Sequence, residues 1–346
     1  MRNKNKKKIL LVGSNEFFSL ERMYLRAFKK ANCNVKIFHI YNINKNLFFR
    51  FIWKYFKFLY FYQQRQKLQK YIKKNVNKYD LIIIFKGLYL NKKFIIDLKK
   101  ICYSSKFVNI YPDNPFDRNY FNDISNNNLF KALKYFDYFF TYSKKIQKKL
   151  KLILPTNKII YLPFAHDPAI HIRQKLFHKH LYDISFIGTA DKERFNIIRQ
   201  LKDYKIVIGG NGWDRYKQLK NVVYLGAINT QLSATVIRKS TVSLNLLRKQ
   251  NYGSHNMRTF EIPSMNGLML TTRSYEQNKF FPENRASFMF GNTQELNEKI
   301  EYIFSHPEKA KLIRRKGLSL VKKHNYMERL KCLIKLVNEY KKINKF

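Results

Sequence analysis

The sequence predicts an α/β fold built from two consecutive Rossmann-like domains, each with a parallel sheet. Short, almost wholly apolar segments alternate with segments whose apolar residues recur at helical spacing, a pattern typical of parallel sheets covered on both faces. The alternation stops near residue 163 and restarts near residue 183. Open parallel sheets bind ligands outside the carboxyl ends of their strands, so we expect the two sheets to face each other across a cleft that holds the site.

The first half accounts for one domain, residues 1–165. Its expected strands are residues 9–13, 35–41, 80–85, 107–111 and 138–142. Its expected helices are residues 17–30, 91–100 and 125–135. The segment 17–30 has apolar residues at helical spacing.

The second half accounts for another domain, residues 166–325, followed by a C-terminal helix within residues 326–346. Its expected strands are residues 183–187, 205–208, 222–225, 242–246 and 268–272. Its expected helices are residues 192–201, 231–239, 256–265, 293–305 and 308–323. A linker near residues 163–180 joins the domains, and we expect the last helix to cross back to the first domain.

The chain carries 68 Lys and Arg against 23 Asp and Glu, a net charge of +45. Clustered cations bind nucleic acid strongly and without regard to sequence, so a basic nucleic-acid-binding protein is one alternative. The basic residues are spread over the whole chain, and the sequence shows no RNP, HTH, KH or zinc-finger pattern. A compositional bias toward Lys, Asn, Ile, Phe and Tyr explains the surplus equally well.

Three scattered cysteines, Cys33, Cys102 and Cys332, are too few for a disulfide framework and fit a reducing compartment. The apolar stretch 9–12 is too short for the hydrophobic region of a signal peptide. We therefore expect a cytoplasmic protein.

The first strand-to-helix turn argues against the commonest cofactors. It has one glycine, Gly13, where a dinucleotide fingerprint needs three for close backbone approach to a pyrophosphate. The sequence has no P-loop either. No cofactor is expected, and the candidate binding motif lies in the second half of the chain.

Arg258 and Glu261 are three residues apart in the segment 251–267, so they share a face in the early turns of a helix. A cation, a carboxylate and the positive end of a helix dipole together suit a nucleotide diphosphate. Arg258 would hold the phosphates, and Glu261 would accept hydrogen bonds from both ribose hydroxyls. The alternative is that Arg258 and Glu261 only pair with each other on a helix surface.

The run Arg258-x-Phe260-Glu261-x-x-Ser264-x-Asn266-Gly267 resembles the R-x-F-E-x-x-A-x-G signature of the CgeB-like (spore protein YkvP/CgeB-type) glycosyltransferases. The similarity covers roughly residues 183–335. It includes, in order, Asp183-Ile-Ser-Phe-Ile-Gly188-Thr, Glu193-Arg194, Gly209-Gly-Asn-Gly-Trp213, Val223-Tyr-Leu-Gly226, Ser243-Leu-Asn-Leu246, Thr293-x-Glu295-Leu and Tyr326-x-x-Arg329, with a weaker echo in Tyr111-Pro-Asp-Asn-Pro115. The resemblance implies the two-domain GT-B fold.

The resemblance also implies roles for residues. The C-terminal domain would hold a nucleotide-sugar donor and the N-terminal domain the acceptor. Glu261 would bind ribose, Arg258 the diphosphate, and the loop of Gly188 and Thr189 would lie near the phosphates with help from Arg194.

The motif departs from the family pattern at two positions. Pro263 removes a backbone N–H within the helix, so we expect a kink or a short helix. Asn266 replaces a glycine, which the left-handed end of a helix tolerates.

The sequence offers no D-x-D pair in a plausible strand-end loop, so we expect metal-independent transfer with the leaving group stabilised by cations and a helix N-terminus. Asp113, at the end of a predicted strand, is the candidate catalytic base. Its alternative is an Asx-type turn before Asn114-Pro115. His166, His171 and His255 are weaker candidates for the base.

Residues 46–74 form an aromatic and basic stretch without proline or glycine. Cations interrupt the apolar span, so we expect an interfacial helix rather than a transmembrane one. Its predicted membrane contacts are Arg50, Trp53, Lys54 and Lys57. The cations lie on one stripe with Arg65 and would meet anionic lipid, and Trp53 belongs to the aromatic remainder, which would sit at the headgroup level. The alternative is an aromatic face packed on the first sheet, and both can hold.

Together these observations predict a glycosyltransferase of the hexosyltransferase type. It would move a sugar from a nucleotide diphosphate sugar to a glycan or lipid-linked acceptor in cell-surface polysaccharide or glycoconjugate synthesis. The expected location is the cytoplasm, peripherally at the inner face of the membrane. A GT-B-like sugar-nucleotide epimerase is a further alternative, but it would need extra carboxylates at the donor sugar, for which the sequence shows no clear set.

Overall fold

The structure of the protein is a computed structural model that describes residues 7–40, 56–116, 124–171, 180–216 and 219–343. The chain divides into two compact units, Met1–Pro163 with Arg329–Phe346 and Phe164–Glu328. Helix α13 (Tyr326–Ile343) starts in the second unit and continues in the first.

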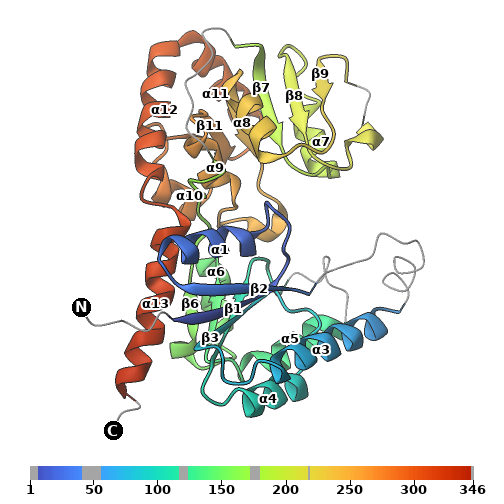
Figure 1. Ribbon diagram of the computed structural model, residues 1–346. Coiled ribbons are helices and arrows are strands. Elements are labelled where there is room, and N and C mark those ends of the chain that lie inside the picture. Colours follow the sequence, from blue (N-terminus) through green and yellow to red (C-terminus); the bar gives the residue numbers. More distant parts are fainter. Residues whose placement is uncertain (1–6, 41–55, 117–123, 172–179, 217–218, 344–346) are drawn as a thin grey trace. The chain divides into compact units, whose positions relative to one another are not determined.

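The first unit is a six-stranded parallel sheet with helices (Figure 1). Its strands are β1 (Lys8–Gly13), β2 (Asn34–His39), β3 (Leu81–Phe85), β4 (Lys106–Tyr111), β5 (Tyr138–Thr141) and β6 (Ile159–Tyr161). Its helices are α1 (Leu20–Lys30), α3 (Lys57–Lys73), α4 (Lys92–Ile101), α5 (Ile124–Leu133) and α6 (Lys144–Leu150), with a 3₁₀ turn at Thr156–Lys158. The strand order is β2-β1-β3-β4-β5-β6.

Strands β1, β3, β4 and β5 of the first sheet are buried along almost their whole length because helices cover both faces. Alternate residues such as Leu10, Ile82 and Phe107 belong to one buried cluster with side chains of α3, α4 and α5. Figure 1 shows these three helices together on one side of the sheet, with α1 on the other. On the α1 side, Tyr24 packs against Phe85 with ring centroids 5.6 Å apart. This packing confirms the expectation from continuous apolar strands.

The second unit holds another six-stranded parallel sheet, with strand order β12-β11-β10-β7-β8-β9. Its strands are β7 (Tyr182–Ile187), β8 (Ile206–Gly209), β9 (Val222–Tyr224), β10 (Ser240–Asn245), β11 (Met269–Thr272) and β12 (Phe288–Phe290). Its helices are α7 (Lys192–Ile198), α8 (Thr230–Arg238), α9 (Arg258–Ser264), α10 (Tyr275–Phe280), α11 (Thr293–Ser305) and α12 (Pro307–Val321), with 3₁₀ turns at Trp213–Tyr216 and Lys249–Asn251.

Counted from β7, the second sheet has the order 6-5-4-1-2-3, which is the doubly wound arrangement of nucleotide-binding folds. The order reverses between β7 and β10, which pair in parallel. Ligands of such sheets bind outside the carboxyl ends of the strands at this switch point. The fold therefore predicts a ligand site beside the residues that follow Ile187 and Asn245.

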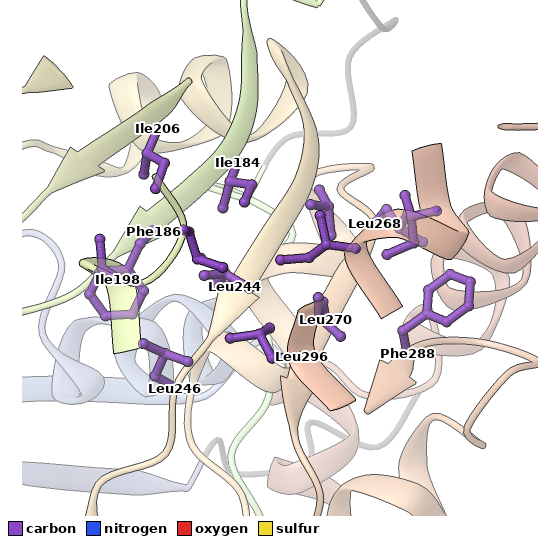
Figure 2. Packing of buried hydrophobic residues seen from close by; sticks show 14 of the residues in the cluster. Ile184, Phe186, Ile198, Ile206, Leu244, Leu246, Leu268, Leu270, Phe288 and Leu296 are labelled. Atoms are coloured by element: carbon purple, nitrogen blue, oxygen red, sulfur yellow. The ribbon is translucent and has the colours of Figure 1, made fainter. Parts of the chain in front are cut away.

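A core of aliphatic and aromatic side chains fixes the second sheet (Figure 2). Phe186 of β7, Leu244 of β10 and Leu296 of α11 are all at most 2% exposed. Burial of one such side chain stabilises a fold by about 1.5–3 kcal/mol, so the strand ends at the switch point rest on a rigid base.

The predicted pair of parallel sheets is confirmed, and most predicted elements are present within a few residues. The sequence prediction lacked β6, β12, α6 and α10. These elements span three to seven residues, too few to show a clear period. Of the predicted aromatic stretch 46–74, the described part from residue 56 onward contains α3.

Candidate functional site

Helix α9 carries the central motif, and its local sequence sets both ends. Oδ1 of Asn256, two residues before the helix, accepts a hydrogen bond from the Thr259 N–H (3.1 Å) in its first turn. The helix ends after seven residues at Ser264, one residue past Pro263. Asn266 then adopts a left-handed conformation (φ 65°), which the Gly267 N–H to Ile262 carbonyl bond (3.0 Å) completes. The short helix and the tolerated asparagine are therefore as expected.

A buried polar network attaches the segment that precedes α9 to the end of β10. Nδ2 of Asn256 donates to Oδ1 of Asn245 (2.8 Å). Nδ2 of Asn245 in turn donates to Oε1 of Gln277 (3.0 Å), which also accepts from the Thr259 hydroxyl (2.8 Å). Buried polar groups that are hydrogen-bonded to one another hold a single arrangement. The start of α9 is thus fixed at the carboxyl edge of the sheet.

Arg258 extends from α9 to the end of β7. Its Nε donates to the Ile187 carbonyl oxygen (3.1 Å), and its Nη1 donates to Oε2 of Glu261. The side chain is 31% exposed. The pairing with Glu261 that the sequence left as an alternative is present, and it occurs at the switch point rather than on an outer helix surface.

Glu261 is a buried carboxylate, with a side chain only 5% exposed. Besides Arg258, it faces His171, whose Nε2 lies 3.5 Å from Oε1 of Glu261. A buried carboxylate is costly unless it has a charged or hydrogen-bonding partner. This one has a partner at each oxygen.

The predicted loop of Gly188 and Thr189 follows β7 directly and is held closely by its neighbours. The Gly188 N–H donates to the Gly209 carbonyl (2.8 Å), and the Gly188 carbonyl accepts from the indole N–H of Trp213 (2.8 Å). Gly210 has φ 143°, and a Cβ atom there would collide with the Gly188 carbonyl. Only glycine permits this approach of two backbones.

Arg194 holds the same loop through hydrogen bonds to backbone carbonyl groups. Its two terminal nitrogens donate to the carbonyl oxygens of Thr189 and Leu246, each at 2.8 Å. Its Nε lies 3.5 Å from Oδ2 of Asp191. These contacts use the guanidinium fork to join the ends of β7 and β10, which is a supporting position rather than one that reaches outward.

Two residues near this edge were not assigned there from the sequence. Nε of Arg248 lies 3.4 Å from Oδ2 of Asp191, in the loop that follows β10. A cation just after a predicted strand end was the available signal. From the sequence, His171 is only a weak candidate for the base. Its contact with Glu261, ninety residues further along the chain, produces no local pattern in the sequence.

Asp113 lies in the first unit, in the segment after β4. Its Oδ2 is 2.7 Å from Nζ of Lys86, which follows β3. Strand β1 lies beside β3 in the sheet, and the N–H of Ser14, which follows β1, donates to Oε1 of Glu21 on α1 (2.8 Å). Burial raises the pKa of the Glu21 carboxyl. Charged groups thus follow three strands of this sheet at their carboxyl ends.

The predicted membrane contacts are only partly described. Arg50, Trp53 and Lys54 lie outside the described residues, and Lys57 starts α3 without a described side chain. Arg65, expected on the same basic stripe, donates instead to the Tyr89 carbonyl (2.9 Å). Along α3, Leu68 and Ile72 are buried. The exposed large apolar side chains at its start, between 41 and 65% exposed, are Phe56, Phe58, Leu59 and Tyr62.

Within the described ranges, no group of three or more His, Cys, Asp or Glu side chains is arranged to hold a metal ion. Among the helices that the structure describes, none is both long and apolar enough to span a bilayer.

Comparison with known proteins adds to this geometry. Residues 193–335 match the protein family described as glycosyl transferase-like. Among solved structures, the HepE protein of Anabaena in complex with UDP-glucose is 10% identical with a TM-score of 0.67, covering 96% of this chain and 99% of HepE. Sucrose-phosphate synthase of Thermosynechococcus elongatus is 11% identical with a TM-score of 0.69, covering 98% of this chain and all of that one.

A third similar structure is WaaB, a lipopolysaccharide outer core galactosyltransferase, at 12% identity and a TM-score of 0.62, covering 94% of this chain and 99% of WaaB. No curated protein matches the sequence. The structural matches confirm the predicted GT-B fold. The residues that match the family, 193–335, include Arg194 and helix α9 with Arg258 and Glu261. Residues 193–335 therefore match a glycosyl transferase-like family, and the chain as a whole has the GT-B fold.

Proposed function

We propose that the protein transfers a sugar from a nucleotide diphosphate sugar to a glycan or lipid-linked acceptor, with the donor held by the second unit. The observation that carries this proposal is the position of Arg258 and Glu261. They belong to the glycosyl transferase-like domain, and Arg258 bonds the last residue of β7 at the switch point of a doubly wound sheet. A cation and a buried carboxylate at this point suit a diphosphate and a ribose.

Different residues bind different parts of the donor. Arg258 and the backbone N–H of Thr189, in the loop that Gly188 begins, bind the diphosphate, and Arg194 holds that loop in place. In the transition state the leaving nucleotide diphosphate gains negative charge, which fixed cations and oriented N–H groups stabilise. Glu261 binds the ribose hydroxyls, since a carboxylate offers about four acceptor positions and the two described contacts use one at each oxygen.

The likeness to structures with nucleotide-sugar chemistry in their names supports a uridine donor as the first choice. HepE was solved with UDP-glucose, and WaaB is named as a lipopolysaccharide galactosyltransferase. The CgeB-like subgroup remains our proposal within the broader family, on the motif from Arg258 to Gly267. A nucleic-acid-binding protein and an epimerase receive no support from these matches.

Isothermal titration of the full chain with UDP-, GDP-, dTDP- and CMP-sugars tests donor binding. We expect one nucleotide class to bind and Glu261→Gln to weaken that binding by about tenfold, because hydrogen bonds to a charged acceptor are worth roughly 1.5–3 kcal/mol. Glu308→Gln is the matched control, as that carboxylate is 81% exposed at the start of α12. Binding of no donor, or equal weakening by both variants, would refute the proposal.

We further propose that transfer needs no metal ion. Turnover is then unchanged by EDTA. Loss of activity in EDTA that a divalent cation restores would show that a metal serves the leaving group instead.

We also propose that the first unit attaches peripherally to an anionic membrane surface, at the cytoplasmic face. The exposed apolar side chains at the start of α3 support this, and the basic stretch that precedes them in the sequence is suited to anionic lipid. Membrane attachment would bring a lipid-linked acceptor to the first unit.

A further inference from the structure

His171 is a buried histidine whose tautomer is set by the backbone. The side chain is 1% exposed, and its Nδ1 accepts a hydrogen bond from the Asp167 N–H (2.8 Å). A ring nitrogen that accepts a hydrogen bond carries no proton, so the proton of the neutral ring is on Nε2. That N–H faces Oε1 of Glu261, 3.5 Å away.

Glu261 is therefore held from two sides. Arg258 donates to Oε2, and the Nε2–H dipole of His171 faces Oε1 at the outer limit of hydrogen-bond distance. The two donors come from different segments, α9 and the chain that follows Phe164, so together they set the plane of the carboxylate. About two acceptor positions of the carboxylate are left, which equals the number of hydroxyls on a ribose.

We propose that His171 is a positioning residue that orients Glu261 toward both ribose hydroxyls and so gives the site its selectivity for ribonucleotides over 2′-deoxyribonucleotides. This inference rests on the donor role proposed above for Glu261. A site built to bond a hydroxyl rejects the analogue that lacks it, because a buried polar group is then left unpaired. Without His171 the carboxylate can turn, and this penalty falls.

His255 offers a matched control in the same unit. It is fully buried, its Nε2 accepts from the Phe164 N–H (3.1 Å), and its Nδ1 donates to Oε2 of Glu276 (2.8 Å). Thus both histidines take a backbone N–H at one nitrogen and face a buried glutamate at the other. They differ in tautomer and in the carboxylate they face.

The test compares affinities for UDP and 2′-deoxy-UDP, with the guanosine and adenosine pairs as further probes, in the full chain. We expect His171→Leu to lower the ribo-to-deoxy preference by about tenfold. His171→Gln restores much of it, since a glutamine amide N–H can take the place of Nε2–H. His255→Asn is expected to lower the unfolding temperature without changing the preference. An unchanged preference in folded His171→Leu, or an equal loss in His255→Asn, would overturn the proposal.

Nitrogen-15 NMR of labelled histidine separates this inference from the donor role. The wild type should show His171 in the Nε2–H form, and Glu261→Gln should shift that resonance while leaving His255 unchanged. The opposite tautomer, or no response to Glu261→Gln, overturns the positioning of Glu261 even if nucleotides bind. If the NMR result holds but no nucleotide of any pair binds, the proposed donor site fails and the ribose role of His171 fails with it. If His171→Leu does not fold, the Gln variant and the NMR comparison decide.

Discussion

Nζ of Lys86 lies 2.7 Å from Oδ2 of Asp113, and the two residues follow the neighbouring strands β3 and β4. Lys86 takes a left-handed backbone conformation (φ 59°), which non-glycine residues adopt at a cost. Such strained residues are concentrated at functional sites. The pair is therefore the strongest described candidate for acceptor chemistry in the first unit.

Replacing Asp113 by Asn is expected to lower turnover by about 100-fold or more while donor affinity stays unchanged, because a general base contributes roughly 10²–10⁴ to the rate. The measurement is release of nucleotide diphosphate with an acceptor that the wild type uses. Asp97→Asn, on α4 of the same unit, is the control. Full activity of Asp113→Asn would leave Asp113 only the turn-forming role that its Asn-Pro neighbours suggest.

Arg194 and Arg258 are expected to respond differently to the same change, arginine to lysine. Arg194→Lys loses the fork that joins the Thr189 and Leu246 carbonyls, so the free energy of unfolding should fall by about 2 kcal/mol. Arg258→Lys keeps a positive charge beside Glu261 but loses planar phosphate recognition, so donor affinity should fall by about tenfold. Calorimetry and donor titration on both variants check this. If Arg194→Lys weakened binding at unchanged stability, Arg194 would be a ligand contact.

The local motif of the proposed donor site could be predicted from sequence because its parts are close together along the chain. Arg258 and Glu261 share one turn, Pro263 shortens that helix, and Asn266 ends it. The strands that carry the site, β7 and β10, were also predicted from local sequence, since apolar residues recur along each within a few positions. Contacts between residues far apart along the chain could not be predicted: Arg194 bonds Leu246 from 52 residues away, and His171 lies beside Glu261, 90 residues further on. Short elements such as β12 also gave no signal, because three apolar residues show no period.

The exposed start of α3 gives a prediction about membranes. Phe58→Asp with Tyr62→Asp should reduce flotation with anionic vesicles by about tenfold or more, because burying one aromatic side chain contributes roughly 1.5–3 kcal/mol. Gln63→Asp with Gln66→Asp adds the same two charges at exposed positions of the same helix. Equal loss in both double variants would indicate charge alone, and no loss in either would exclude α3 as the contact.

Arg273 and Glu295 give a prediction about pH. Arg273 lies after β11 and bonds Glu295 in the first turn of α11, and these hydrogen bonds, with one from the Gly291 N–H, lower the pKa of Glu295 from 4.5 to about 2. A carboxyl whose pKa is lower in the folded state adds stability above its unfolded pKa, and that contribution disappears as the pH falls toward the folded value. The full shift corresponds to roughly 3 kcal/mol, but Arg273 is 40% exposed, so solvent screening reduces the expected effect to about 1 kcal/mol.

Glu295→Gln should therefore be less stable than the wild type by about 1 kcal/mol at pH 7, and the difference should shrink as the pH falls from about 4.5 toward 2. Glu298→Gln is the control, because that residue is exposed one turn further along α11. Unfolding by denaturant, followed at several pH values between 3 and 7, measures the difference. A gap that stays constant over this range would mean that Glu295 acts through its neutral hydrogen bonds, which glutamine loses only in part, and that its charge contributes nothing.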